Sequence, residues 1–282
     1  MVIDMHTHAF PEALAPVVLD KLQEAARAKI HIAGTPQALQ ASMKRARVDY
    51  SVILPVATNA RQPHKLNLAA AEINEHSSET GLISFGAMHP DDPNWQEELR
   101  FLAQHGFRGI KLHPAYQGPF FDDIRYLRIV GRAAELGLLI TVHAGLDIGV
   151  PGPAKVTPDN TLRVLRETGA DKLILAHMGG WMIWDQVLER LAGQPVYLDT
   201  SFSFGRVNPH PDYPRTEDEL RLGDTSLLLR LIRAHGADRV LFGSDSPWGD
   251  QGADLDLLRS LDLTGEELRR IEGENARTLL GL

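Results

Sequence analysis

Two kinds of hydrophobic pattern alternate along the chain. One is a short, nearly continuous run, which is typical of a strand buried on both faces, and the other is the three-to-four-residue spacing of an amphipathic helix. Runs of the first kind occupy residues 2–8, 50–56, 82–88, 109–113, 138–142, 173–176, 196–199 and 240–244. Helical spacing occupies residues 11–29, 36–47, 65–78, 95–105, 123–136, 158–168, 184–191, 225–235, 255–261 and 266–280. The pattern therefore predicts strands and helices that alternate through the whole chain.

Residues that begin or end helices fall where these segments meet. Gly106, Gly137 and Gly169 each follow a predicted helix, as expected because glycine readily adopts the backbone conformation that ends one. Thr264, followed three residues later by Glu267, has the spacing of a capping box at the start of the last helix. The local signals agree with the alternation.

Strands that alternate with helices in this way predict an α/β fold, and specifically a (β/α)8 TIM barrel. A doubly wound open sheet is the alternative, because alternation alone also fits it. No linker or low-complexity segment divides the chain, so we expect one domain over residues 1–282. The longest insertions, residues 9–35 after strand one and 203–225 after strand seven, both follow the C-terminal ends of strands. In a barrel these insertions would hang over the same mouth, where they could form a lid.

Composition narrows the class of function. The chain is 43% hydrophobic and 23% charged, which is ordinary for a globular protein with a large core. Its net charge of −8 argues against binding to nucleic acid or to an anionic membrane, so we expect a small-molecule substrate. The sequence leaves a homodimer open, and the lack of a targeting segment or a long apolar run makes a cytoplasmic location the default expectation. There is no cysteine, so any metal must be held by His, Asp or Glu.

His6 and His8 lie at the end of the first predicted strand. Residues two apart in a strand point to the same side, so both imidazoles project together as a pair of potential metal ligands. Taken alone this motif is weak, because His-x-His arises by chance in a chain with 12 histidines. Other strands, however, end in groups of the same kind, namely His89, His113, His143, His177, Asp199 and Asp245. The ends of barrel strands converge on one rim, so the sequence predicts a metal site there.

With these motifs the chain resembles the metal-dependent amidohydrolase superfamily. Within it, the resemblance is to the amidohydrolase-related branch that includes aminocarboxymuconate semialdehyde decarboxylase and related TIM-barrel enzymes. The motifs that carry it span almost the whole sequence: Asp4-Met5-His6-Thr7-His8, Lys111-Leu112-His113-Pro114, His143-Ala144-Gly145, Ala176-His177-Met178-Gly179-Gly180 and Phe242-Gly243-Ser244-Asp245-Ser246-Pro247-Trp248.

The resemblance implies that His6, His8, His143 and Asp245 bind one divalent metal ion, which we expect to be Zn²⁺. His177 is implied either to bind the metal too or to hydrogen-bond the metal-bound water. Three neutral imidazoles and one carboxylate leave the ion with a net positive charge, which can lower the pKa of bound water to about 7. Asp245 and His177 are accordingly the predicted catalytic residues.

Lys111 lies two residues before His113 on predicted strand four. Some members of the wider superfamily hold two metals through a carboxylated lysine at the end of that strand. The alternatives are an ammonium group that binds a substrate carboxylate and a structural ion pair. We favour a single metal, because the closer branch is similar in using one and because Lys111 sits deeper than the strand tip.

The remaining candidates lie around this centre. Lys111, His113 and Trp248 are predicted to contact the substrate, although a histidine before a proline, as in His113 and His89, equally fits a capped strand end. Asp199 fits either a partner of a metal-binding histidine or a turn residue. Trp181 and Trp248 could form an aromatic wall, whereas Trp184 is expected to pack in its helix.

The predicted activity is metal-dependent hydrolysis of an amide, lactone or similar carbonyl bond in a small organic acid. The alternative is nonoxidative, metal-dependent decarboxylation of an aromatic or unsaturated carboxylic acid, because one type of site supports several chemistries. From a different class of function, the chain could be an inactive metal-bound barrel that serves as a binding protein.

Overall fold

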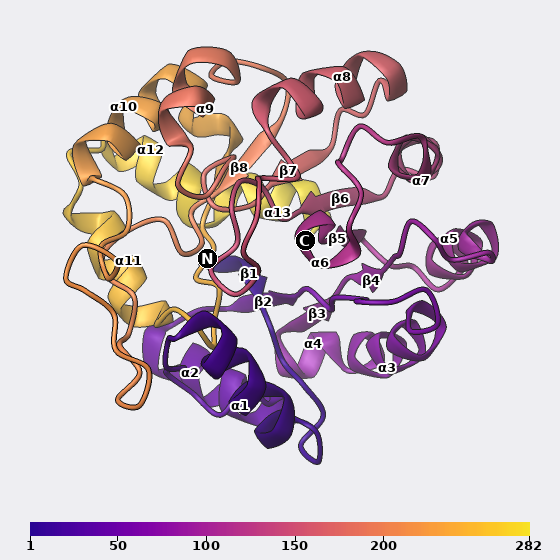
Figure 1. Cartoon of the computed structure of the whole chain (residues 1–282), viewed down its shortest axis with the longest axis horizontal. Coiled ribbons are helices and arrows are strands. Elements are labelled where there is room, and N and C mark those ends of the chain that lie inside the picture. Colours follow the sequence, from indigo (N-terminus) through magenta and orange to yellow (C-terminus); the bar gives the residue numbers. More distant parts are fainter.

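A closed ring of parallel strands, surrounded by helices, forms the body of the protein in a computed structural model that describes all residues 1–282 (Figure 1). The strands are β1 (Ile3–Thr7), β2 (Tyr50–Ile53), β3 (Leu82–Ser84), β4 (Gly86–Ala87), β5 (Gly109–Leu112), β6 (Leu139–Val142), β7 (Leu173–Leu175), β8 (Tyr197–Asp199) and β9 (Val240–Leu241). All the pairs between neighbouring strands are parallel. This is the predicted (β/α)8 barrel, and the open-sheet alternative is wrong.

The predicted third strand is divided in two at Phe85. Its first half, β3, pairs with β2, and its second half, β4, pairs with β5. The ring closes between β9 and β1 through backbone hydrogen bonds, including Met5 N to Phe242 O (2.8 Å) and Asp245 N to His6 O (2.8 Å). The first and last strands therefore meet where two of the predicted metal ligands lie.

Most of the helices form the outer layer of the barrel (Figure 1). The helices are α1 (Ala15–Ala26), α2 (Pro36–Ala46), α3 (Pro63–Glu75), α4 (Ser77–Thr80), α5 (Trp95–Gln104), α6 (Pro114–Gln117), α7 (Ile124–Glu135), α8 (Pro158–Thr168), α9 (Trp184–Arg190), α10 (Thr225–His235), α11 (Gln251–Ser260), α12 (Gly265–Arg269) and α13 (Asn275–Leu280). Helix α13 packs against the hydrophobic cluster inside the barrel and overlies the ring, as α6 does, in Figure 1. The capping box at Thr264 and Glu267 is present, with Glu267 N donating to Thr264 Oγ1 over 3.2 Å.

Several helical segments differ from the sequence prediction, among them α1, which begins at Ala15, and the helix predicted over residues 65–78, which is divided into α3 and α4. Pro114 ends β5 as expected but also opens the short helix α6, because its fixed φ suits a first helical position. Helix α11 begins at Gln251, four residues earlier than predicted, because the Asp250 carboxylate caps it by accepting from Ala253 N. The last predicted helix is interrupted by a π-helical turn at Arg270–Glu274, which divides α12 from α13.

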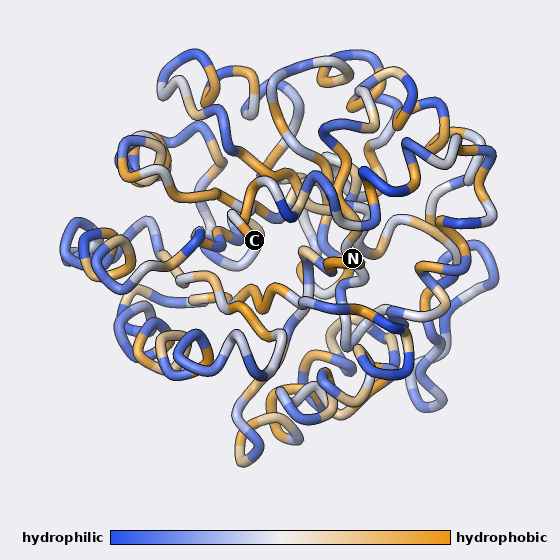
Figure 2. The backbone as a smooth tube through the Cα atoms, turned by 180° about the vertical axis from the view of Figure 1, so that it is seen from behind, coloured by the Kyte–Doolittle hydropathy of each residue, from blue (hydrophilic) through white to orange (hydrophobic).

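Hydrophobic side chains fill two main spaces. A small cluster inside the barrel contains Ile3, Met5, Val52 and Phe85, and a larger cluster lies between the strands and the surrounding helices. In Figure 2 the strands near the centre are mostly hydrophobic in sequence, whereas the outer helices and loops carry most of the hydrophilic segments. The polar ends of the strands therefore stand on a rigid apolar base.

The two predicted insertions contact each other over the carboxyl ends of the strands. Ala28 pairs with Pro209 in an isolated antiparallel bridge, and Lys29 N donates to Asn208 O over 2.9 Å. A separate hydrophobic cluster of Ala26, Ala28, Val207 and Leu220 joins the insertions, with Ile148, Phe202 and Trp248 packed against it. We call this joined structure the cap.

Each helix of the protein is either too short or too polar to span a membrane.

Candidate metal centre

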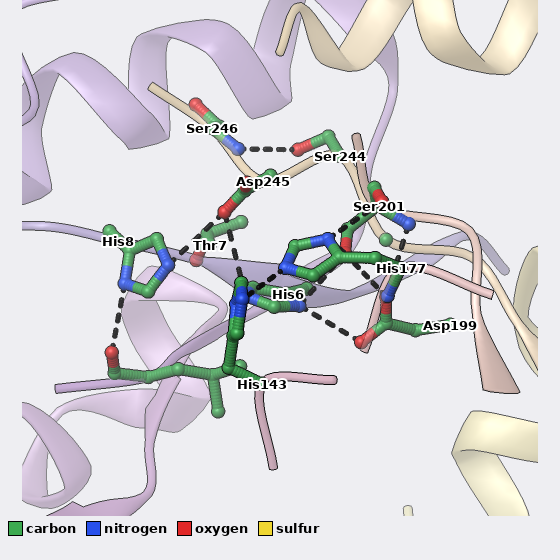
Figure 3. A network of polar contacts seen from close by, with 12 residues as sticks. His6, Thr7, His8, His143, His177, Asp199, Ser201, Ser244, Asp245 and Ser246 are labelled. Atoms are coloured by element: carbon green, nitrogen blue, oxygen red, sulfur yellow. Dashed lines mark hydrogen bonds and ion pairs between the residues drawn. The ribbon is translucent and has the colours of Figure 1, made fainter. Parts of the chain in front are cut away.

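His6, on β1, and His8, just after it, each have one ring nitrogen that contacts an oxygen atom on the side away from Asp245. We call this the outer nitrogen of the ring and the other the inner nitrogen. His6 Nδ1 lies 2.9 Å from a carboxylate oxygen of Asp199, at the end of β8. His8 Nδ1 lies 2.9 Å from the backbone carbonyl oxygen of Leu54. Their Nε2 atoms both face Asp245 Oδ1, at 3.5 Å for His6 and 3.1 Å for His8, as Figure 3 shows. The predicted convergence of His6, His8 and Asp245 is thus present in the structure.

His143 and His177, which follow β6 and β7, complete the same cluster (Figure 3). His143 Nδ1 and His177 Nε2 lie 3.0 Å apart. The outer nitrogen of His143, Nε2, lies 2.8 Å from Leu146 O, and the outer nitrogen of His177, Nδ1, lies 2.9 Å from Ser201 O. The rings of His6 and His177 are neighbours, with centroids 5.2 Å apart.

The outer contacts determine where the ring protons lie. A neutral imidazole has one N–H group and one lone pair, and an oxygen that can only accept requires the N–H to point toward it. Carbonyl or carboxylate oxygens occupy the outer position of all four rings. The lone pairs must therefore lie on the inner atoms, which are His6 Nε2, His8 Nε2, His143 Nδ1 and His177 Nε2.

The inner lone pairs of His8, His143 and His177 face other acceptors, whereas that of His6 also faces Lys111 Nζ at 3.2 Å. The 3.0 Å contact between His143 and His177 brings two lone pairs together, and the 3.1 Å contact between His8 and Asp245 brings a lone pair toward a carboxylate oxygen. Such contacts are repulsive unless a proton or a cation lies among them. The donor types suit a divalent metal ion, and three triads have ligand atoms within 4.8 Å of one another: His6, His8 and Asp245; His6, His177 and Asp199; and His113, His143 and Asp147. His143 is joined to the first two triads by its contact with His177.

Burial keeps the ligands in the charge states that a metal needs. Burial lowers the pKa of His6, His143 and His177, for His177 to about 3, so that these rings stay neutral at pH 7. Burial alone would raise the pKa of Asp245, but the neighbouring His6 and His8 lower it when they carry a proton toward the carboxylate, and a bound cation would act in the same direction, so Asp245 stays ionised. Metal ligands of these types bind as neutral imidazole and carboxylate.

Two of these residues adopt an uncommon backbone conformation. Asp245 has φ 61° and His177 has φ 58°, both in the left-handed region that residues other than glycine seldom occupy. Hydrogen bonds hold both in place, with Asp245 N bonded to His6 O at 2.8 Å and His177 N bonded to Asp199 Oδ1 at 3.0 Å. Such strain is maintained at functional sites by the surrounding structure.

Lys111 reaches the centre despite its depth on β5. Its side chain is only 1% exposed, and its Nζ lies 3.2 Å from His6 Nε2. Burial lowers the pKa of Lys111 to about 8, while the charges of Asp199 and Asp245 partly oppose this shift. Although Lys111 lies two residues before the end of the predicted strand, its long side chain spans that distance and reaches the predicted metal ligands.

The other predicted residues lie at different places around the centre. His113 is buried and stacks on His143 with ring centroids 4.2 Å apart, and its Nε2 lies 3.5 Å from Asp147 Oδ2. His89 instead turns back on its own loop, where its Nδ1 accepts from Asp91 N. Trp248 packs under the cap, and Trp184 is part of the main core as expected.

Three residues near the centre were missed in the sequence. Ser201 Oγ lies 2.9 Å from His6 Nδ1 and 3.0 Å from His177 Nδ1, and it donates to Asp199. Asp147 Oδ2 lies 3.5 Å from His113 Nε2 and 3.6 Å from His143 Nε2. The Asp4 carboxylate accepts a hydrogen bond from the backbone N–H of His6. Ser201 lies two residues after Asp199, the same spacing as His6 and His8, and this was the available signal.

The chain matches the family model described as Amidohydrolase over residues 3–282. The chain belongs to the Amidohydrolase family. No curated protein sequence matches it. Family membership places the chain in a general class of metal-dependent hydrolases and lyases, in agreement with the donor set at the strand ends.

Several solved structures share the fold of this chain. The 2,6-dihydroxybenzoate decarboxylase from Rhizobium is 19% identical with a TM-score of 0.68, covering 99% of this chain and 98% of that one. The 5-carboxyvanillate decarboxylase from Sphingomonas paucimobilis is 14% identical with a TM-score of 0.70, covering 100% and 99%. A dihydroxybenzoic acid decarboxylase from Polaromonas, with bound manganese and the inhibitor 2-nitroresorcinol, is 16% identical with a TM-score of 0.66, covering 100% and 97%.

Proposed function

We propose that the protein uses one divalent metal ion to act on a carboxyl or carbonyl group of a small organic acid. The observation that carries this proposal is the direction of the imidazole lone pairs, which point inward on four rings whose outer N–H groups are all engaged. His6, His8, His143 and Asp245 would hold the ion, with His177 beside them. When bound, the ion supplies positive charge that binds an anionic oxygen and lowers the pKa of water.

Zinc is the ion we propose. An imidazole-rich set without thiolates suits Zn²⁺, and the family shares this general chemistry. Manganese, which the Polaromonas decarboxylase contains, is the competing choice because a carboxylate ligand also suits it. We keep the single-metal proposal, in which Lys111 remains an amine whose charge depends on its buried surroundings.

For the reaction, we propose nonoxidative decarboxylation of a small aromatic or unsaturated carboxylic acid. The sequence favoured hydrolysis, but the three solved relatives described above are decarboxylases, and this supports the alternative. In decarboxylation, the bond between the carboxylate carbon and the substrate carbon that carries it breaks, and carbon dioxide leaves. The electron pair of that bond stays on the substrate carbon, which then takes up a proton. Buried residues around the centre would exclude bulk water from this step.

Apolar side chains near the mouth support a planar substrate. Phe202 and Trp248 pack against the cap, and the rings of Trp181 and Phe202 have centroids 6.1 Å apart. Apolar walls beside a few convergent polar groups are typical of small-molecule sites. We propose that Trp248 and His113 contact the substrate from opposite sides of the centre, with Lys111 offering an amine below it.

Hydrolysis is the second candidate, and the position of Asp245 favours it. Its carboxylate lies between His6 and His8, where it can accept a proton from a water molecule directed at a substrate carbonyl. His177 would then hydrogen-bond the water or the carbonyl oxygen. The same residues serve both reactions, so the products must distinguish them.

A panel of substrates in ¹⁸O-labelled water tests the proposal. The metal-loaded protein would be assayed with hydroxybenzoates and unsaturated carboxylic acids on one side, and with lactones and amides on the other, each with and without a chelator. We expect metal-dependent carbon dioxide release and no ¹⁸O in the organic product. Incorporation of ¹⁸O without carbon dioxide would establish hydrolysis instead, and a metal-loaded protein inert toward the whole panel would favour the binding-protein reading.

A further inference from the structure

The barrel closes through a buried carboxylate that bonds to the backbone of a predicted metal ligand, His6. Asp4 is fully buried on β1, two residues before His6. Its Oδ1 accepts from the backbone N–H groups of His6 (3.1 Å) and Ser244 (3.0 Å), and its Oδ2 accepts from Ser244 Oγ (2.6 Å) and Gln251 Nε2 (2.8 Å). A single side chain thus joins β1, the segment after β9 and helix α11.

These four bonds fall where the regular sheet hydrogen bonds are interrupted. Between Phe242 and Asp245, the backbone N–H of Gly243 bonds to the Thr200 hydroxyl and that of Ser244 bonds to Asp4, so neither reaches the backbone of β1. The strands nevertheless approach closely here, because a Cβ on Gly243 would lie 2.9 Å from the Cβ of His6. The Asp4 side chain takes the place of the missing backbone bonds at this crossing.

The two donors to Asp4 Oδ1 belong to the two sides of the metal site. One is the backbone N–H of His6 itself, and the other is the backbone N–H of the residue immediately before Asp245. Fixing both to one oxygen atom fixes the separation of the two ligand-bearing backbones. We propose that Asp4 is a positioning residue that sets the spacing of His6 and Asp245, and thereby the affinity and geometry of the metal site.

This inference rests on the metal site of the proposed function, and it adds a residue with no contact to the ligand atoms in the structure. An Asp4→Asn substitution keeps the shape of the side chain but replaces one acceptor oxygen with an NH₂ donor. In the wild type all four partners donate to the carboxylate. An NH₂ group at the Oδ1 position would oppose two backbone N–H groups, whereas at the Oδ2 position it faces the Ser244 hydroxyl and Gln251, whose Oε1 has no partner and can turn to accept. In either orientation the bonds lose the charge of the carboxylate and weaken, so we expect the His6 and Asp245 backbones to shift.

Asp49→Asn is the matched control. The Asp49 carboxylate also accepts from a backbone N–H of the N-terminal segment, that of Val2 at 2.7 Å, but at the end of β1 away from the metal ligands. Ser244→Ala is the graded variant, because it removes one donor to Asp4, together with the acceptor of the Ser246 backbone N–H, and leaves the carboxylate in place. The side chains of Asp49 and Ser244 make no hydrogen bond to the side chain of a proposed metal ligand.

Cobalt(II) binding to the metal-free full chain provides the test. Folding of each apo variant would be checked by circular dichroism and thermal unfolding, and Co²⁺ affinity and absorption spectrum would be measured well below the unfolding temperature. We expect Asp4→Asn to weaken Co²⁺ binding about 10- to 100-fold, the range typical for partners that support metal ligands, and to change the visible absorption band. Ser244→Ala should change both in the same direction by less, and Asp49→Asn should change neither.

The outcomes separate the two proposals. A folded Asp4→Asn protein with wild-type Co²⁺ affinity and spectrum overturns the positioning role of Asp4 and leaves the proposed function intact. Failure of the wild-type protein to bind Co²⁺ or Zn²⁺ overturns the proposed function and this inference together. If Asp4→Asn does not fold, Ser244→Ala decides, and wild-type binding by that variant overturns the inference.

Discussion

The substitution Asp199→Asn is expected to prevent His6 from binding the metal, although His6 itself is unchanged. Asp199 Oδ1 is held by three donors, which are the backbone N–H groups of His177 and Ser201 and the hydroxyl of Ser201, whereas Oδ2 faces only His6 Nδ1 among the residues bonded to it. In the variant, the amide oxygen must keep the position with three donors. The NH₂ group therefore faces His6 and favours the tautomer in which His6 Nδ1 accepts and Nε2 carries the proton.

The size of the effect follows from this tautomer change. A protonated Nε2 cannot bind a metal, so binding must restore the original tautomer, with two N–H groups facing each other. The loss of a hydrogen bond to a charged partner costs about 1.5–3 kcal/mol. Because about 1.4 kcal/mol corresponds to a factor of ten, Zn²⁺ affinity should fall about 10- to 150-fold.

Competition between the apo protein and a chromophoric chelator measures this affinity directly. Asp224→Asn is the control, because Asp224 caps α10 far along the chain from the centre and its substitution changes the formal charge equally. Apo Asp199→Asn must be folded by circular dichroism for the comparison to count. Zn²⁺ affinity within threefold of the wild type would refute the tautomer argument.

Three further predictions concern the metal, pH and the cap. Removal of the metal should abolish turnover and lower the free energy of unfolding, by about 2.7 kcal/mol where free metal had been at 100 times Kd; thermal unfolding unchanged by a chelator would contradict this. His235, whose Nε2 lies 2.9 Å from Val196 O, has its pKa lowered by burial, so the unfolded chain binds its proton more readily and the stabilisation is lost as pH falls below about 6.5. His235→Gln should therefore cost more stability at pH 7.5 than at pH 5.5 in urea unfolding, and an equal cost at both would contradict the assignment. Ala28→Cys with Pro209→Cys, in a chain that has no other cysteine, should form a disulfide across the cap that slows turnover until it is reduced; full activity of the oxidised form would show that the cap need not open.

The sequence was sufficient for the barrel because its signals were repeated and local. Each strand is a continuous hydrophobic run, and capping residues such as Thr264 and Glu267 mark their helices correctly. The division of the third strand at Phe85 was not predicted, although Ser84 and Gly86 flank it in the run 82–88, because the change of partner depends on the curvature of the closed ring. Helix α6 was missed because Pro114 both ends a strand and starts a helix.

The histidines and Asp245 were predictable because strand ends converge in any barrel, whereas the groups that orient them were not. His8 and His177 are oriented by the backbone carbonyls of Leu54 and Ser201, and backbone atoms leave no sequence signal. The role of Asp199 stayed undecided until the distance to His6 was known. Lys111 is the opposite case. Its position on the strand followed from the sequence, but the contact between its Nζ and His6 Nε2 did not.

A crystal structure with anomalous scattering measured at the zinc absorption edge tests the central claim most directly. The account predicts one strong anomalous peak per chain, bound by Nε2 of His6 and His8, Nδ1 of His143 and the carboxylate of Asp245, with unmodified Lys111 beside it. Two peaks bridged by a carboxylated Lys111 would contradict the single-metal proposal. Absence of any peak after growth with Zn²⁺, with the four rings unchanged, would contradict the inference that their inner lone pairs hold a metal ion.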